Sequence, residues 1–260
     1  MFNMTGASFK SDLAIENILT IYIPEPMAVK MIFTQSELDD FLQQIKEKGF
    51  TKLVDAALFH GLSVDYLTSQ ITAISAITSS PFEGFASSVQ NGDLQPGMYN
   101  GQHINGLRDG YGLLFTKLCN CPCLYECQWD KGKPIKGKWI NRDDKQWSKY
   151  EGPFDELCLA TGTGNYQSED GETYQGEYKR GKRHGYGKVT YPSGKSYDGQ
   201  WQNNNKHGQG RYTYSSGRYE EGQWKDSKKV GEHKKYSKEG TLRELITYED
   251  DKKVKREKVQ

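Results

Sequence analysis

At residues 174–187 the chain reads Tyr174-Gln-Gly176-Glu-Tyr178-Lys-Arg-Gly181-Lys-Arg-His184-Gly185-Tyr-Gly187, and at 197–210 it reads Tyr197-Asp-Gly199-Gln-Trp201-Gln-Asn-Asn-Asn-Lys-His207-Gly208-Gln-Gly210. The two stretches align without a gap, and the second begins 23 residues after the first. A fixed period of this size is typical of repeat architectures, in which one unit is too small to bury its own face and is stacked on copies of itself. The sequence therefore predicts a repeat protein.

The same template continues in both directions along the chain. Its starting positions are Tyr99, Tyr125, Tyr150, Tyr174, Tyr197 and Glu220, so the successive spacings shrink from 26 through 25 and 24 to 23 and 23. Residues 97–248 are therefore predicted to form one array of about six units. The array is expected to close with a final strand that contains Leu242, Leu245, Thr247 and Tyr248.

Each unit is predicted to be a β-hairpin. Tyr, Gly and an aromatic residue at positions i, i+2 and i+4 point to one face of a strand, because strand side chains alternate. Gly181 and the run Asn203-Asn204-Asn205 fit tight turns, since Gly and Asn tolerate positive φ. Successive hairpins are expected to add side by side, so the predicted fold is mainly β with one long antiparallel sheet.

The pattern Y-x-G-x-(W/Y/F)-x-x-G-x-x-H-G-x-G resembles the MORN repeat. The units at 174 and 197 fit it at nearly every defining position, the unit at 99 fits well, and the units at 125, 150 and 220 are degenerate. Residues 224–248 look more like the divergent second type of this repeat. The resemblance implies an elongated, twisted, single-layer antiparallel sheet. It also implies a scaffold, because such modules serve in ciliary radial spokes, cytoskeletal baskets and membrane-contact proteins and accompany certain lipid kinases and SET-domain methyltransferases.

The segment before the array is predicted to be a small helical domain over residues 1–80. Apolar positions spaced for one helix face predict helices that begin at Ser36 and end before Gly49, then span Lys52–Phe59 and Ser63–Ile77. Two short strands are possible at 18–23 and 29–33. Residues 81–96 are rich in turn-forming residues and are expected to be a linker.

Acidic and basic residues are distributed unequally between the two parts of the chain. Residues 1–95 contain 5 basic and 11 acidic side chains, and the remainder contains 30 basic and 23 acidic ones. The mean hydropathy of −0.84 and the hydrophobic content of 35% are low for a compact core, whereas 17 Tyr and 28 Gly are abundant, as expected for a thin sheet. Pro24 and Lys30 interrupt the most apolar stretch, so neither a secretory nor a membrane-spanning segment is expected. These observations favour a soluble cytoplasmic protein with reduced cysteines.

Four closely spaced cysteines are candidate ligands for a metal ion. Cys119, Cys121, Cys123 and Cys127 supply four thiols, the number that a tetrahedral zinc site uses, but with unusual spacing. In one extended strand they lie too far apart to converge on one ion unless Pro122 breaks the strand. The alternative is a loop insertion between the first two repeats with buried thiols. We favour that alternative and expect no metal and no cofactor.

Catalysis is not expected either. His184 and His207 are template residues, and the glycine pairs accompany neither a P-loop lysine nor a dinucleotide fingerprint.

The leading functional interpretation is a non-enzymatic scaffold that joins protein subunits of a large assembly, ciliary or cytoskeletal. Exposed aromatic rings offer rigid contact area at low entropic cost. The predicted partner-binding residues are Tyr174, Tyr178, Tyr197, Trp201, Tyr219 and Trp224, with contacts inside the sheet as the alternative role for each. A homo-oligomer through the ends of the array is also plausible, because an open sheet has edges that must be covered or charged.

The competing interpretation is peripheral binding to anionic phospholipid. The basic residues that favour it are Lys179, Arg180, Lys182 and Arg183 in the repeats and Lys252, Lys253, Lys255, Arg256 and Lys258 in a predicted basic tail at 249–260. Nucleic acid is not expected as a partner, because the basic excess is small and scattered.

Overall fold

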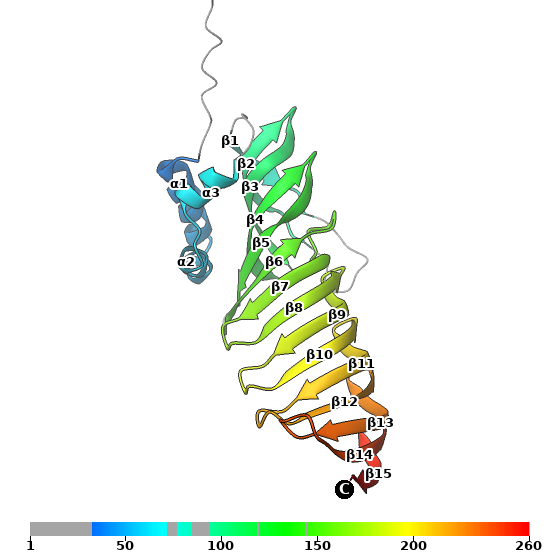
Figure 1. The fold of residues 1–260 in the computed structure, drawn as a ribbon. Helices are drawn as coiled ribbons and strands as arrows, with labels where there is room; N and C mark the ends of the chain where they lie inside the picture. The colour runs from blue at the N-terminus through cyan, green and yellow to red at the C-terminus, as the bar shows by residue number, and fades with distance from the viewer. Residues whose placement is uncertain (1–32, 72–76, 85–93, 119, 144, 260) are drawn as a thin grey trace, which may run out of the picture.

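The computed structural model describes residues 33–71, 77–84, 94–118, 120–143 and 145–259. In this part of the chain three helices precede one open antiparallel sheet of 15 strands, whose spatial order follows the chain from β1 to β15 (Figure 1). The helices are α1 (Gln35–Glu47), α2 (Thr51–Phe59) and α3 (Val64–Gln70). The strands are β1 (Ile77–Phe82), β2 (Gly97–Ile104), β3 (Leu107–Leu118), β4 (Cys121–Asp130), β5 (Lys133–Arg142), β6 (Trp147–Pro153), β7 (Gly162–Ser168), β8 (Thr173–Lys179), β9 (Lys182–Thr190), β10 (Ser196–Gln202), β11 (Asn205–Thr213), β12 (Tyr219–Lys225), β13 (Lys228–Tyr236), β14 (Leu242–Glu249) and β15 (Lys252–Lys258). The prediction of a mainly β fold built as one long sheet behind an N-terminal helical segment is confirmed.

Two-residue turns close most of the hairpins. Both turn residues have positive φ, as a type I′ turn requires, and this turn matches the twist of antiparallel strands. The pairs are Asn105-Gly106, Lys131-Gly132, Arg180-Gly181, Asn203-Asn204, Asp226-Ser227 and Asp250-Asp251. Where the second residue is not glycine, its side chain caps the preceding hairpin: Asn204 Oδ1 accepts from the backbone N–H of Arg183 at 2.8 Å.

The template tyrosine of each regular unit lies flat over glycines of its own sheet. A Cβ atom on Gly187 would lie 2.2 Å from the hydroxyl oxygen of Tyr174, and one on Gly210 would lie 2.3 Å from that of Tyr197. The tyrosine hydroxyl donates to the backbone carbonyl three residues later, at 3.0 Å for Tyr174 and 2.9 Å for Tyr197. The glycines are thus required because the rings occupy the space above them.

These rings form a continuous line along one face of the sheet. Neighbouring rings meet edge to face with centroids 5.0–5.6 Å apart, a favoured aromatic geometry. The line runs through Tyr150, Tyr178, Tyr174, Trp201, Tyr197, Trp224, His233 and Tyr248. We call this side of the sheet the aromatic face and the other side the polar face.

The G-x-G part of the template produces a bulge in each regular hairpin. Gly185 has φ +57°, and the pairing of β8 with β9 shifts register between Gly176 and Tyr178. The backbone N–H of Tyr186 then donates to Oε1 of Glu177 at 2.8 Å. Glycine is favoured here, because it adopts φ +57° without strain and because a Cβ on Gly185 would lie 2.5 Å from the Glu177 carboxyl group and displace it.

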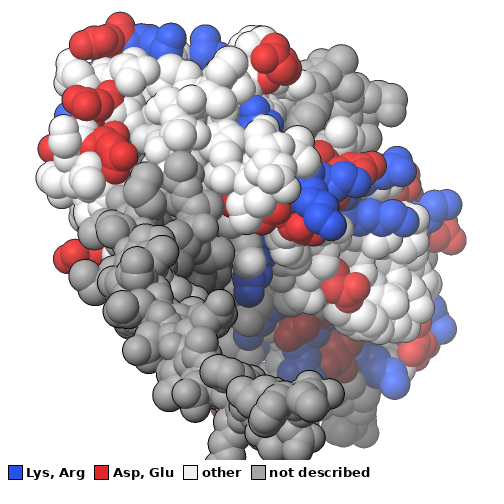
Figure 2. Space-filling model, turned by 90° about the horizontal axis from the view of Figure 1, so that it is seen from above, with Lys and Arg blue, Asp and Glu red and all other residues white. Residues whose placement is uncertain are grey.

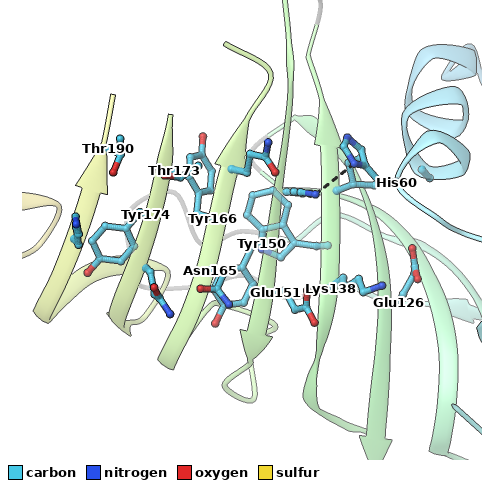
Figure 3. A pocket seen from close by; sticks show the side chains of 17 residues that line it. His60, Glu126, Lys138, Tyr150, Glu151, Asn165, Tyr166, Thr173, Tyr174 and Thr190 are labelled. Carbon is cyan, nitrogen blue, oxygen red and sulfur yellow. Dashed lines mark hydrogen bonds between the residues drawn. The ribbon is translucent and has the colours of Figure 1, made fainter. Parts of the chain in front are cut away.

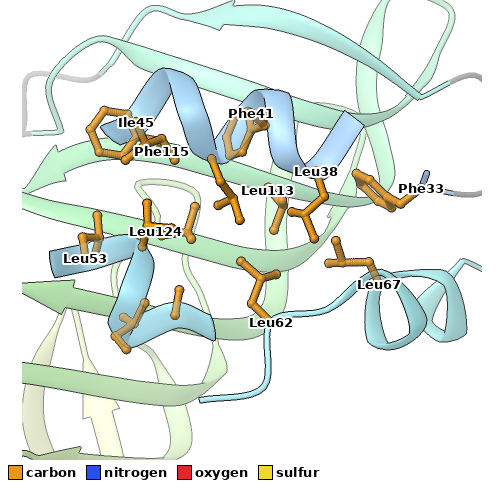
Figure 4. Packing of buried hydrophobic residues seen from close by; sticks show 14 of the residues in the cluster. Phe33, Leu38, Phe41, Ile45, Leu53, Leu62, Leu67, Leu113, Phe115 and Leu124 are labelled. Carbon is orange, nitrogen blue, oxygen red and sulfur yellow. The ribbon is translucent and has the colours of Figure 1, made fainter. Parts of the chain in front are cut away.

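The helices cover the polar face of the first strands. α1 begins with a capping box in which Thr34 and Glu37 satisfy each other's backbone donors. Figure 4 shows the resulting core, in which the buried side chains of the helices meet Leu113, Phe115 and Leu124 of the sheet. Helices and strands therefore share one hydrophobic core at this end of the molecule.

Several predicted boundaries differ from the structure. The first helix is capped by Thr34 and not by Ser36, and the third ends at Gln70, because Ile71 already has extended backbone angles. Ile77 and the start of the predicted linker belong to β1, which pairs with β2. The predicted strands at 18–23 and 29–33 lie outside the described residues, apart from Phe33.

The prediction of a basic tail after residue 248 was also wrong in its structure. β15 pairs with β14 and makes a seventh hairpin, which together with β1 completes the sheet. Alternating charge in place of alternating hydrophobicity hides this strand from a pattern search, because both of its faces are exposed.

Candidate functional site

The six predicted partner-binding residues are mostly inside the molecule. The expectation of exposure was wrong for Tyr174, Tyr178, Tyr197, Trp201 and Trp224, whose exposed fractions are 9% or less. They are buried because each ring lies against the next ring, and Tyr174 and Tyr197 also lie over glycines. Their part in partner binding stays a prediction.

Tyr219 lies apart from the other five. It precedes the template position Glu220, so its ring points to the polar face, where it stacks on Tyr236 with centroids 4.7 Å apart. The guanidinium of Arg211 lies 4.3 Å from the ring centroid of Tyr219. This half-buried ring is thus the one predicted binding residue that remains on the surface of the polar face.

A line of cations covers the aromatic face, and the sequence analysis missed it. Each cation stands nine residues after a template start, which makes its spacing as regular as that of the tyrosines. The four cations are Arg108, Arg183, Lys206 and Lys229. Each lies within 6 Å of the centroids of three or four aromatic rings, the range of cation–π attraction.

The unit at 220 has a buried charged cluster in place of the template tyrosine. Glu220 is 0% exposed, and its Oε2 accepts from Lys229 Nζ at 2.8 Å and from the Tyr214 hydroxyl at 2.6 Å. His233 lies on the other side of the carboxylate, with Nδ1 3.4 Å from Oε1 of Glu220. Burial alone would raise the pKa of Glu220, but His233, Lys229 and Tyr214 outweigh burial and lower it.

A groove of about 550 Å³ lies on the polar face, beside α2 and across β4 to β9 (Figure 3). The helical segment covers β5 and, through His60, reaches Trp147 and Lys149 of β6, so the face of the strands after β6 is left uncovered. Ala57 of α2 and His60, the residue that caps its C-terminus, line one wall, and alternate residues of the strands line the floor. The side chains with polar or charged groups are His60, Glu126, Lys138, Lys149, Glu151, Asn165, Gln167, Thr173, Gln175, Lys188 and Thr190.

Two pairs of titratable side chains occupy the helical end of this groove. Glu126 and Lys138 are opposite each other in the β4–β5 pairing, and Glu126 is buried with Oε2 lacking a hydrogen-bond partner. Burial raises the pKa of Glu126 to about 7, although Lys138 opposes the shift. On the other side, Lys149 Nζ lies 3.4 Å from Nδ1 of His60, and burial together with Lys149 lowers the pKa of His60. The imidazole is therefore neutral at pH 7 and accepts from the ammonium group.

The family model described as MORN repeat matches residues 99–115, 174–196 and 197–217. The chain therefore contains three segments that match the MORN repeat. These three segments include the hairpin residues whose tyrosines lie over glycines, so sequence and geometry identify the same units. No curated protein matches the sequence.

MORN repeats are known for interactions with proteins or membranes, and an all-β repeat fold of this kind is typically non-enzymatic. The groove and the two faces of the sheet are therefore surfaces on which to look for partners. Function still has to be argued from particular sites, because an architecture hosts many functions.

The cysteines lie beside the first MORN repeat. β4 runs straight through Pro122, which pairs with Lys117, so the proline does not fold the segment into a loop. Cys123 and Cys127 are buried among the aromatic rings. Cys119 lies outside the described residues, and within the described ones no three His, Cys, Asp or Glu side chains are arranged to hold a metal ion.

The thiols of Cys127 and Cys158 are buried in the hydrophobic core. Burial is the main cause that raises the pKa of both Cys127 and Cys158. Both groups are therefore protonated thiols at neutral pH and poor nucleophiles.

The basic residues proposed to face a membrane lie in different surroundings. Lys179 and Arg180 are exposed and Lys182 is half-buried around the turn between β8 and β9. Arg183 is part of the line of cations, where it forms an ion pair with Glu172 and has only 18% of its side chain exposed. The basic side chains of β15 are exposed along the last strand. On the face that Figure 2 shows, Lys and Arg lie next to Asp and Glu. Among the described helices, none is both long and apolar enough to cross a membrane.

Proposed function

We propose that this chain is a non-enzymatic scaffold that docks protein subunits of a large cytoplasmic assembly, of the ciliary or cytoskeletal kind. The observation that carries the proposal is the groove on the polar face, an uncovered surface that runs over six strands beside α2. The sheet holds this surface rigid, because the aromatic face behind it is filled by interlocked rings. A rigid, preformed surface binds a partner at low entropic cost.

The occupant that fits the groove is an extended protein segment with polar side chains of both charges. Lys138, Lys149 and Lys188 offer donors, and Glu126 and Glu151 offer acceptors. The amide side chains on the floor, such as that of Asn165, can both donate to and accept from a peptide backbone. An apolar helix would leave these groups unpaired, which costs free energy.

A groove-filling variant tests the proposal. Asn165→Trp places an indole on the floor of the groove, whereas Lys225→Trp places the same side chain at an exposed position on β12. We expect the proteins that co-purify with the wild type from its native cell to be lost with Asn165→Trp and kept with Lys225→Trp. Each captured protein is then tested as a purified pair, by calorimetry. Equal recovery with both variants would contradict docking in the groove.

The exposed basic strand β15 favours one second candidate, peripheral association with anionic lipid. Each basic residue near such a surface contributes about 1 kcal/mol. Flotation with phosphatidylcholine vesicles, with and without phosphatidylserine, tests it at low salt. Binding that needs phosphatidylserine and disappears when Lys252, Lys253 and Lys255 are changed to Ser would support this candidate, and equal flotation with both vesicle types would remove it.

A further inference from the structure

The four cations on the aromatic face differ in what oxygen atoms they meet. Arg108 donates to the backbone carbonyl of Pro81 at 2.8 Å, Arg183 pairs with Glu172, and Lys229 pairs with Glu220. Lys206 is the exception. Within the described part of the chain its ammonium group has neither a hydrogen bond nor a carboxylate within ion-pair distance.

Lys206 is surrounded by aromatic rings in the same way as Arg108, Arg183 and Lys229. Its Nζ lies 4.8–5.7 Å from the ring centroids of Tyr191, Tyr197, Tyr212 and Trp224. The group is half-buried, and burial, followed by repulsion from Lys229, lowers its pKa even though Asp251 acts in the opposite sense. An ammonium group that has lost water without gaining an anion is a strong site for one.

The repeat shows which residue is missing. Glu172 stands eleven residues before Arg183, and Lys195 stands eleven residues before Lys206. Both belong to equivalent turns, in which the backbone carbonyl of Glu172 accepts from Ser168 and that of Lys195 accepts from Tyr191, each at 2.9 Å. A cation therefore replaces the carboxylate that the preceding unit supplies from its own chain.

Tyr191 adds a second donor. It is equivalent to Tyr214, which stands 23 residues later and donates its hydroxyl to the carboxylate beside Lys229 at 2.6 Å. Lys206 and Tyr191 therefore correspond to Lys229 and Tyr214 of the next unit. The pair in the next unit binds the carboxylate of Glu220, and no equivalent carboxylate is bound to Lys206 in the described part of the chain.

We propose that Lys206, with Tyr191 and Tyr212 beside it, is a binding site for the carboxylate of an Asp or Glu side chain from an acidic segment of a partner protein. The carboxylate takes the place that Glu172 takes against Arg183. The site lies on the aromatic face, whereas the groove lies on the polar face, so either one can fail without the other.

Binding of a fluorescein-labelled hexaglutamate peptide, followed by anisotropy at low salt, tests the site. We expect Lys206→Met to weaken binding about tenfold, the loss that corresponds to one charge-assisted hydrogen bond. Lys195→Glu supplies an internal carboxylate in the Glu172 position and is expected to weaken binding as strongly. In the double variant the two losses should not add, because both close the same site.

Lys225→Glu is the matched control, because it makes the same change of charge at an exposed position of β12 that lies outside the groove. We expect it to weaken binding no more than twofold. Melting temperatures check that every variant is folded, and the side-chain ammonium signal of Lys206 in NMR spectra should shift on addition of the peptide to the wild type. Equal losses with Lys225→Glu and Lys195→Glu, or an unmoved Lys206 signal, would overturn the proposal. So would binding of phosphatidylserine vesicles through Lys206 without binding of the peptide.

Discussion

The imidazole of His233 lies over Gly222 and faces the carboxylate of Glu220, with Nδ1 3.4 Å from Oε1. One repeat earlier, the ring of Tyr197 lies over Gly210. The two units therefore fill the same space from opposite strands, since Tyr197 comes from the first strand of its hairpin and His233 from the second. Because His233 fills the space of the template tyrosine, the template position itself can hold the buried carboxylate of Glu220 within the line of aromatic rings.

Glu220→Gln should destabilise the protein by about 3 kcal/mol at pH 7, because it leaves the ammonium group of Lys229 half-buried without its counter-charge. The pKa of Glu220 is lowered in the folded state, so the ionised form stabilises the fold at every pH above the ordinary value of 4.5. As the pH falls below 4.5 this stabilisation is lost, and wild type and variant should converge. Urea unfolding from pH 3 to pH 8 measures the difference.

Glu221→Gln is the control for this prediction. Glu221 pairs with Arg211 on the polar face, and both side chains are more than a third exposed. Its loss should cost less than about 1 kcal/mol, as for most surface ion pairs. A Glu220→Gln variant no less stable than Glu221→Gln would show that the buried cluster does not stabilise the fold.

Gly210→Ala should destabilise the array by about 2 kcal/mol, because its Cβ would collide with the ring of Tyr197 and the ring has no free space to move into. Gly106→Ala is the comparison: its Cβ meets no atom within 4 Å, so it bears only the cost of φ +77° for a side chain, about 1 kcal/mol. Denaturant unfolding of both variants separates the two causes. The ring-over-glycine arrangement is wrong if Gly106→Ala proves the more harmful of the two.

The hairpins could be predicted from the sequence because period-two spacing of Tyr, Gly and Trp leaves few alternatives. The turns could be predicted for the same reason, since Gly181 and Asn204 permit the positive φ that a type I′ turn requires. These signals are local, and local structure follows them wherever tertiary contacts agree.

Burial of the aromatic rings could not be predicted in the same way. A single layer suggests exposed rings, but here glycines of the same sheet form a floor for Tyr174, and Arg183 covers it. One signal in the sequence could have revealed the cations that cover the rings, because each of them stands nine residues after a template start: Arg108, Arg183, Lys206 and Lys229. The groove depends on where α2 ends over the sheet, a long-range relation that no local pattern carries.

The turn at Asn203-Asn204 offers a test of the turn chemistry. Asn204→Gly should lower the free energy of unfolding by less than about 1 kcal/mol, because glycine keeps the positive φ and only the hydrogen bond to Arg183 is lost. Asn204→Val should cost about 2 kcal/mol, since a β-branched residue at φ +70° is strained as well. Thermal unfolding of the two variants measures the gap, and equal melting temperatures would argue against a strained turn.

Glu126 gives the array an opposite dependence on pH from that of Glu220. Burial raises its pKa to about 7, so the folded state holds the proton more tightly than the unfolded chain, where the ordinary value is 4.5. Its contribution to stability is therefore complete below pH 4.5 and is lost as the pH rises through 7. Glu126→Gln keeps the neutral form at every pH. It should match the wild type at pH 4 and be more stable at pH 8, by at most about 3 kcal/mol. Glu151→Gln changes an exposed carboxylate in the same groove and should show no such difference between pH 4 and pH 8. A Glu126→Gln variant that is less stable than the wild type at pH 8 would mean that Lys138 stabilises the ionised carboxylate in the folded protein.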